Sequence, residues 1–195
     1  MVWLSKAWQH SNPMHRSKLV RLLTDYGHRH PDERDTVDRF LAFVQANERC
    51  FERDLSVGHV TGSAWLVNQP GTHVLLTHHR KLGRWLQLGG HSDGNPDPLA
   101  VAMQEAEEES GLRVTPLSKQ VFDIDIHEIP ARKADPAHFH FDVRFVLRAN
   151  DSDAFAISEE SLDLAWVPVD SLSEYTEEWS VLRMGEKWRE TNLNL

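Results

Sequence analysis

Two stretches near the start of the chain carry apolar residues at helical spacing. The first runs from Met14 to about His28 and the second from about Asp32 to Arg53, with His30-Pro31 between them. The apolar positions that share one side are Leu19, Leu22, Leu23 and Tyr26 in the first stretch, and Val37, Phe40, Leu41, Val44 and Phe51 in the second. Steps of three and four residues predict two helices joined as a hairpin. We expect this extension, residues 1–55, to pack on the main domain; the alternatives are a lid and the interface of a homodimer.

From His59 onward the pattern is typical of strands. The runs 59–68 and 72–80 flank the turn Asn68-Gln69-Pro70-Gly71. Further strand-like runs, at 113–130, 138–149 and 162–172, follow a central helical stretch, and a last helix is expected across roughly Thr176–Arg189. Strands on both sides of one central helix, with another helix at the end, predict an α/β fold. We expect an α/β/α sandwich on a mixed sheet over residues 56–195.

The central helix lies in the stretch GGHSDGNPDPLAVAMQEAEEESGL, residues 89–112. Asp97 is a good N-cap, Pro98 suits the first helical position, and Gly111 suits the residue after the helix. These signals predict a helix over roughly 98–110. Its buried stripe consists of Leu99, Ala102, Met103 and Ala106.

The end of this helix is crowded with carboxylates. Helical phase places Glu105, Glu108 and Glu109 on a second face, whereas Glu107 points away from them. Like charges held this close are unfavourable unless something positive neutralises them. Oxygen ligands on a rigid element suit Mg²⁺ or Mn²⁺, which bind a few carboxylates and complete their shell with water and phosphate.

This stretch resembles the Nudix box. That pattern reads Gly, five residues, Glu, seven residues, Arg-Glu, an aliphatic residue, any residue, Glu-Glu, any residue, Gly and an aliphatic residue. The positions in register are Gly90, Glu105, Glu108, Glu109, Gly111 and Leu112, with Ala106 as a small version of the first aliphatic residue. Two positions depart from the pattern, since Pro96 stands in place of the first Glu and Gln104 in place of the Arg.

The resemblance covers roughly residues 56–175 and implies a Nudix-like fold and a metal-dependent hydrolase. It implies that Glu105, Glu108 and Glu109 hold Mg²⁺ or Mn²⁺, with the Gly90 carbonyl as a further ligand. The expected substrate is a small phosphate-containing molecule, a nucleoside diphosphate linked to another group or a related pyrophosphate compound. Water would attack phosphorus, and a carboxylate of the cluster or a strand histidine would accept the proton.

The strand over 138–145 alternates strictly. One face carries His138, His140, Asp142 and Arg144, and the other carries Phe139, Phe141, Val143 and Phe145. One interpretation is a half-buried strand with a solvated polar face. The other, which we favour, is a catalytic face in which His138 and His140 act as a base, assist the metal or contact phosphate, and Arg144 binds substrate. The His-x-His pair also suits zinc, although the spacing shows no third ligand.

Cations and aromatic residues precede the box. Arg80, Lys81 and Arg84 are either ordinary cations of a surface turn or contacts to the distal phosphate, and Trp85 offers an aromatic face. His91 and Asp93 follow the glycine pair directly, and Asp93 is a candidate to replace the carboxylate lost at Pro96.

Composition narrows the functional classes. The chain has 195 residues and a net charge of −9 without a basic block, which argues against nucleic acid as the main partner. Cys50 is the only cysteine, so neither an internal disulfide nor a multi-cysteine zinc site can form. The sequence has no long apolar run and no apolar signal segment, so we expect no membrane partner and a cytoplasmic location.

Two alternatives stay open at this point. The first is a non-catalytic, nucleotide- or metabolite-binding regulatory module on the same fold, to which Pro96 and Gln104 point. The second is an enzyme like isopentenyl-diphosphate isomerase, which uses a catalytic cysteine and a metal site with several histidines; Cys50 lies outside any matching context.

Overall fold

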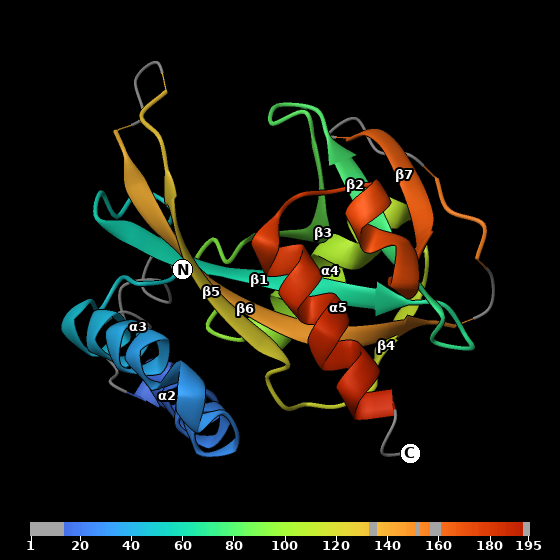
Figure 1. The fold of residues 1–195 in the computed structure, drawn as a ribbon. Coiled ribbons are helices and arrows are strands. Elements are labelled where there is room, and N and C mark those ends of the chain that lie inside the picture. Colours follow the sequence, from blue (N-terminus) through green and yellow to red (C-terminus); the bar gives the residue numbers. More distant parts are fainter. Residues whose placement is uncertain (1–13, 133–135, 151–152, 157–160, 193–195) are drawn as a thin grey trace, which may run out of the picture.

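The computed structural model describes residues 14–132, 136–150, 153–156 and 161–192. In these residues a seven-stranded sheet carries helices on both faces (Figure 1). The strands are β1 (Gly58–Val67), β2 (His73–His79), β3 (Arg84–His91), β4 (Val114–Pro116), β5 (Asp123–Ile129), β6 (His138–Ala149) and β7 (Ser161–Pro168). The helices are α2 (Met14–Arg29), α3 (Arg34–Ala46), α4 (Pro98–Ser110) and α5 (Trp179–Asn192), with 3₁₀ turns at Pro31–Glu33 and Val169–Glu174.

The sheet is mixed, as the sequence predicts. Its order is β4-β6-β1-β3-β2-β7, and β5 also pairs with β6, along His138–Arg144, whereas β4 pairs with Leu147–Ala149. Strands β1 and β6 run parallel over ten registered pairs, from Gly58 opposite Phe139 to Val67 opposite Arg148. The other pairings are antiparallel. The long parallel pair forms the centre of the sheet and brings residues 58–67 beside residues 139–148, which are distant in sequence.

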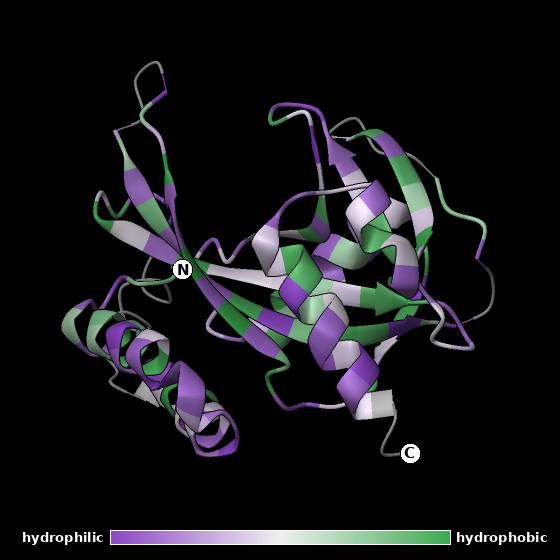
Figure 2. Cartoon of the chain, in the orientation of Figure 1, coloured by the Kyte–Doolittle hydropathy of each residue, from purple (hydrophilic) through white to green (hydrophobic). Residues whose placement is uncertain are grey.

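Alternation along β1 divides the core into two layers. Val60, Ala64 and Leu66 belong to a cluster shared with α4 and the N-terminal hairpin, whereas Trp65 and Val67 belong to a cluster shared with α5. Figure 1 shows α4 behind the sheet and α5 in front of it, and Figure 2 shows hydrophobic residues concentrated along the strands between them. Successive side chains of a strand face opposite sides, so a single strand supplies both layers.

Helices α2 and α3 form the predicted hairpin and pack beside β5 and β6 (Figure 1). Phe40 has no exposed surface, and the Phe43 ring stacks on Phe141 at 3.7 Å between centroids. The hairpin therefore shares its core with the sheet.

The second hairpin helix ends earlier than the sequence analysis expected, at Ala46 and not at Arg53. Asn47 leaves the helix with φ −120° and ψ 105°, and its backbone N–H and side-chain amide both donate to the Phe43 carbonyl. Asparagine competes for backbone hydrogen bonds in this way and favours helix ends. Residues 47–57 form turns that bury Cys50 and Phe51. The last helix likewise begins at Trp179, three residues later than expected.

Candidate functional site

Helix α4 has the boundaries that its capping signals predict. The Asp97 side chain accepts a hydrogen bond from the Ala100 N–H, and Gly111 adopts φ +69° just after the helix. The helix lies very close to β1, because a Cβ on Gly62 would sit 2.6 Å from the Pro98 carbonyl oxygen. Glycine at this position lets the helix approach the sheet and fixes the height of its carboxylates above the strands.

Two carboxylates of α4 lie against the backbone of β3. Glu109 is 8% exposed, and its Oε1 accepts a hydrogen bond of 2.8 Å from the Gly89 N–H. The Glu105 carboxylate occupies the place that a side chain at position 90 would take, since a Cβ on Gly90 would lie 2.4 Å from Glu105 Cδ. The backbone of Gly90 and the Glu105 oxygens are thus brought together, as the box pattern implies for a cation held by both.

The other two acidic residues of the helix, Glu107 and Glu108, make different contacts, although helical phase had grouped Glu108 with Glu105 and Glu109. Glu108 is exposed, and its Oε1 accepts a hydrogen bond of 2.9 Å from Gln104 Nε2. Glu107 instead accepts from the Val114 N–H at 3.2 Å, on the side toward β4. Gln104 therefore orients Glu108 without contributing charge. A set of carboxylate and backbone oxygens on a rigid helix and strand fits a hard divalent cation.

The loop before α4 contributes no further carboxylate to this set. Pro96 is a loop residue without an ionisable side chain, and Asp93 forms a bidentate ion pair with Arg53, at 2.6 Å to Nε and 2.9 Å to Nη2. Asp93 also has φ +47°, a conformation that non-glycine residues rarely adopt. The suggested replacement of the missing carboxylate by Asp93 is therefore not supported by its contacts.

The cationic and aromatic residues expected to bind substrate lie at the other end of β3. Arg84 and Gly90 are six positions apart, about 20 Å along an extended strand. Arg84 Nη1 lies 2.6 Å from Glu178 Oε1, and Arg80 Nη2 donates to the Ser161 carbonyl at 2.8 Å. The Trp85 ring stacks on His78 at 5.1 Å between centroids. The structure does not bring these residues together with the carboxylates of α4.

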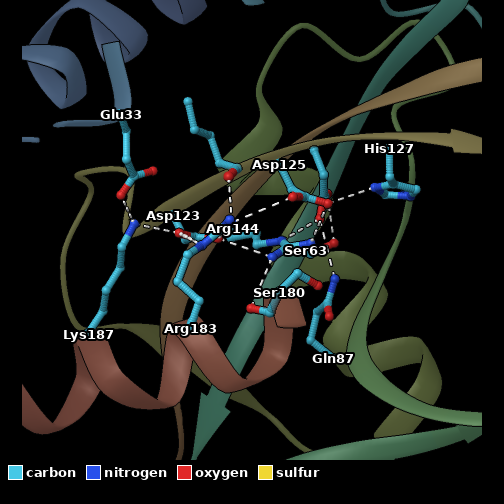
Figure 3. Close-up of polar contacts among 12 residues, drawn as sticks. Glu33, Ser63, Gln87, Asp123, Asp125, His127, Arg144, Ser180, Arg183 and Lys187 are labelled. Carbon is cyan, nitrogen blue, oxygen red and sulfur yellow. Dashed lines mark hydrogen bonds and ion pairs between the residues drawn. The ribbon is translucent and has the colours of Figure 1, made fainter. Parts of the chain in front are cut away.

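Arg144 is buried and engaged with three aspartates, which corrects the expectation of a solvated or substrate-binding position. It is 1% exposed, and its Nε donates to Asp142 at 2.7 Å. Its other nitrogens lie 3.1 Å from Asp123 and 3.3 Å from Asp125 (Figure 3). Burial by itself lowers the pKa of Arg144, but the three carboxylates raise it above its ordinary value. A guanidinium that is almost fully buried and paired with three carboxylates is not available to a substrate, so these contacts give it a structural role.

The polar face of β6 holds a second cluster, made of histidines. Register places His59 of β1 opposite His140, and Thr61 opposite both His91 and Asp142. Ligand atoms of His59, His91 and His140 all lie within 4.8 Å of one another, and they are the one such group of three or more metal-binding side chains among the described residues. Sequence reasoning noticed His91 and His140 separately but missed His59, since only the parallel pairing of β1 with β6 unites them.

The two clusters lie on opposite faces of the sheet. Gly62 and Gly90 pair with each other and face α4, where their missing Cβ atoms would meet Val101 and Glu105. His91 is the next residue along β3, so its side chain points to the other face. His138 and His140 share that face, which separates them from the carboxylates with which the sequence analysis had grouped them.

The comparison with protein families is decisive. The model of the Nudix domain matches residues 58–185. The chain belongs to the Nudix family. Family membership supports a pyrophosphohydrolase, and the residues that carry the box are those whose geometry is described above.

Solved structures show the same Nudix fold at low sequence identity. An Ap4A hydrolase of C. elegans is 14% identical, with a TM-score of 0.59 over 70% of this chain and 98% of that chain. A MutT protein of Methanosarcina mazei is 16% identical, with a TM-score of 0.55 over 71% and 97%. The E. coli dihydroneopterin triphosphate pyrophosphohydrolase is 18% identical, with a TM-score of 0.53 over 66% and 92%.

No curated protein sequence matches this Nudix chain. Among its described residues, none of the helices has both the length and the apolar character required to span a membrane.

Proposed function

We propose that this Nudix protein hydrolyses a phosphoanhydride bond in a nucleoside diphosphate linked to another group, or in a related pyrophosphate compound, with Mg²⁺ or Mn²⁺. The observation that carries the proposal is the contact of Glu105 and Glu109 with the backbone of Gly89 and Gly90. Two structural neighbours are named as hydrolases of phosphate-containing compounds, Ap4A and dihydroneopterin triphosphate.

Each residue of the acidic cluster has a distinct part in this proposal. Glu105, Glu109 and the Gly90 carbonyl would hold the cation, and the Gly89 N–H keeps Glu109 in place. The bound cation would supply positive charge against the diphosphate and favour deprotonation of the attacking water. Glu108, oriented by Gln104, is the exposed carboxylate and would accept the proton. The water oxygen bonds to phosphorus as the bridging P–O bond breaks, and the second phosphate group leaves.

The surface beside these residues has room for a ligand. A hollow of about 460 Å³ lies along the exposed side of α4 and is lined by Ala100, Met103, Gln104, Glu107 and Glu108. This volume is in the range of small-molecule sites. Its position next to Glu108 supports substrate approach from that side.

The test is a panel of nucleoside diphosphate-linked compounds and other pyrophosphates, assayed with Mg²⁺ and with Mn²⁺ for release of phosphate or nucleoside monophosphate. We expect Glu108→Gln to lower kcat at least about 100-fold, because an amide cannot accept the proton. Asp38→Asn is the control, since Asp38 is an exposed carboxylate of α3 that belongs neither to the acidic cluster nor to the lining of the hollow. We expect Asp38→Asn to stay within about threefold of wild type.

A wild-type protein that binds members of this panel but hydrolyses none would favour the non-catalytic module instead. Pro96 favours that second candidate, because it removes one carboxylate of the box. The isomerase alternative loses support from the structure. Although three histidines converge, Cys50 is fully buried and burial raises the pKa of its thiol to about 12, which leaves no reactive thiolate at neutral pH.

A further inference from the structure

Three strands bring three imidazoles to one place on the face of the sheet opposite α4. His59 of β1 lies opposite His140 of β6, and His91 ends the neighbouring strand β3. Ring centroids are 5.0 Å apart for His59 and His91, 4.8 Å for His59 and His140, and 5.1 Å for His91 and His140. The three backbones are held by hydrogen-bonded pairing of adjacent strands, so the cluster is set by the rigid centre of the fold.

Two of these imidazoles carry buried nitrogen atoms without a partner. His59 is 2% exposed, and neither its Nδ1 nor its Nε2 has a hydrogen-bond partner. The Nε2 atom of His140 is also buried without a partner. Buried polar atoms are nearly always satisfied in folded proteins, so unpartnered nitrogens that converge on one point indicate a bound ligand.

The charge state of the cluster suits a metal ion. Burial, with the neighbouring histidines, lowers the pKa of His59 to about 4 and that of His140 to about 2. Burial thus favours the neutral imidazole, the form that has a lone pair for a metal. Nearby His138 points its Nδ1 at the Pro136 carbonyl at 2.9 Å, a contact that assigns the proton to Nδ1 and leaves Nε2 as a potential donor to a metal.

We propose that His59, His91 and His140 bind Zn²⁺ or another late first-row transition-metal ion, at a site separate from the carboxylates of α4. Imidazole nitrogen suits zinc, nickel, copper and iron, whereas Mg²⁺ prefers oxygen. A tetrahedral zinc ion holds its nitrogen ligands about 3.3 Å apart, and ligand atoms within 4.8 Å reach that spacing with small side-chain rotations. Three protein ligands leave the fourth position open to water or an anionic ligand.

The alternation of β3 keeps this site apart from the acidic cluster. Gly90 faces Glu105, and His91, the next residue, faces the other side of the sheet. One cation bound by carboxylates and one bound by histidines would thus be distinguished by donor chemistry and by position. The zinc-type site does not depend on the proposed hydrolysis.

The test titrates Co²⁺, as a spectroscopic substitute for Zn²⁺, into the full chain after chelation of all metals and in the presence of excess Mg²⁺. We expect one equivalent to bind with the intense visible absorption of tetrahedral cobalt, and Zn²⁺ to displace it. Loss of a residue that contacts a metal ligand, and not the metal itself, typically lowers metal affinity about 10–100-fold. His140→Gln and His91→Gln should each weaken cobalt binding by more than this.

Two control variants locate the ion. His28→Gln changes an exposed histidine of α2, and Glu108→Gln changes the acidic cluster; both should leave the cobalt spectrum unchanged. Circular dichroism verifies folding of each variant. If His140→Gln does not fold, the cobalt titration of His91→Gln tests the site instead, because His91 is only half-buried.

Three outcomes would overturn the proposal: no saturable cobalt binding, the weak absorption of octahedral cobalt, or binding that survives both histidine substitutions or is lost on Glu108→Gln. Hydrolysis is assayed in the same preparations with Mg²⁺ alone. Cobalt binding without hydrolysis would leave the histidine site standing and reject the proposed function, and hydrolysis without cobalt binding would do the reverse.

Discussion

At the scale of single residues, the acidic site depends on where side chains are missing as much as on where carboxylates are present. Gly62 lets α4 approach β1, and Gly90 leaves the space that the Glu105 carboxylate fills. Glu108 is held by Gln104, which supplies a hydrogen bond in place of the charge that the family pattern has at that position. Small changes at Gly90 or Gln104 should therefore affect activity before they affect folding, whereas a side chain at position 62 would meet the backbone of α4.

Gly90→Ala tests the contact between β3 and Glu105. The new Cβ would meet the end of a flexible side chain, at 2.4 Å from Glu105 Cδ, so the carboxylate should move and the fold should persist. A displacement of about 1 Å can cost about 100-fold in rate. We expect kcat/KM to fall at least tenfold with little change in Tm, as measured by steady-state kinetics and thermal unfolding. In a Glu105→Gln background the same substitution should have little further effect; an equal loss there would contradict this explanation.

Gln104→Arg restores the residue of the family pattern. An arginine four residues before Glu108 can donate to the same carboxylate and adds positive charge beside the acidic cluster. We expect kcat/KM to stay the same or rise by a few-fold. A fall of tenfold or more would show that the site is adapted to glutamine, and it would be detected in the same kinetic assay.

At the scale of elements, the hairpin is part of the core and not a loosely attached extension. Phe40 is fully buried, and Phe43 stacks on Phe141 of β6. This packing argues against a lid that opens at low cost, because opening would expose several aromatic side chains. Helix α4 carries the carboxylates, and strand β3 places Gly90 and His91 on opposite faces of the sheet.

Phe40→Ala tests whether the hairpin and the sheet unfold together. Loss of a fully buried phenylalanine lowers the free energy of unfolding by about 3–5 kcal/mol. We expect this decrease in a single cooperative urea transition, monitored by tryptophan fluorescence. Asp38→Ala, an exposed change on the same helix, should stay within about 0.5 kcal/mol. Two separate transitions, of which Phe40→Ala shifts only one, would mean that the hairpin unfolds independently.

At the scale of the whole molecule, one buried ionic network joins the hairpin, the sheet and the last helix (Figure 3). Asp123 of β5 forms ion pairs with two cations of α5, at 2.6 Å to Arg183 Nη2 and 2.6 Å to Lys187 Nζ. It also pairs with Arg144 Nη1 of β6 at 3.1 Å. Lys187 also pairs with Glu33, in the 3₁₀ turn that joins α2 to α3. The network spans elements from both ends of the chain, so its loss should affect the entire fold.

Asp123 makes stability depend on pH. Burial by itself raises its pKa, but Arg144, Arg183 and Lys187 outweigh burial and hold the pKa of Asp123 below its usual value. A carboxyl with a lowered folded-state pKa stabilises the protein above its unfolded pKa, about 3.9, and loses that contribution as the pH falls through the folded value. We expect the free energy of unfolding to decrease below about pH 4, measured by urea denaturation across pH.

Asp123→Asn should remove that part of the acid dependence and destabilise the protein by about 3–5 kcal/mol at pH 7, because three cations would lose a buried partner. Asp170→Asn is the control, since Asp170 is 89% exposed and pairs with Arg189 at 3.7 Å. Exposed pairs contribute at most about 1 kcal/mol. Equal effects of the two substitutions would contradict a central role for Asp123.

The local features of the site could be predicted from sequence because they depend on neighbours along the chain. Capping residues and helical spacing predicted α4 and the outward direction of Glu107, and alternation predicted which residues of β6 share a face. The same alternation placed Asp142 beside Arg144 but could not show that Arg144 is buried, because its other partners, Asp123 and Asp125, lie on β5 and are brought to it by sheet pairing. The early end of α3 at Ala46 was missed because Asn47 competes for a backbone carbonyl that helical periodicity ignores.

The sequence by itself determined the family, the identity of the acidic residues and the boundaries of the helix that carries them, since each is encoded within about twenty consecutive residues. Only the tertiary structure decided which distant residues meet. The parallel pairing of β1 with β6 joins His59 to His140, and the pleat of β3 sends Gly90 to the carboxylates and His91 to the histidines. Strand order and register arise from packing of the whole sheet between α4 and α5, which no local pattern specifies.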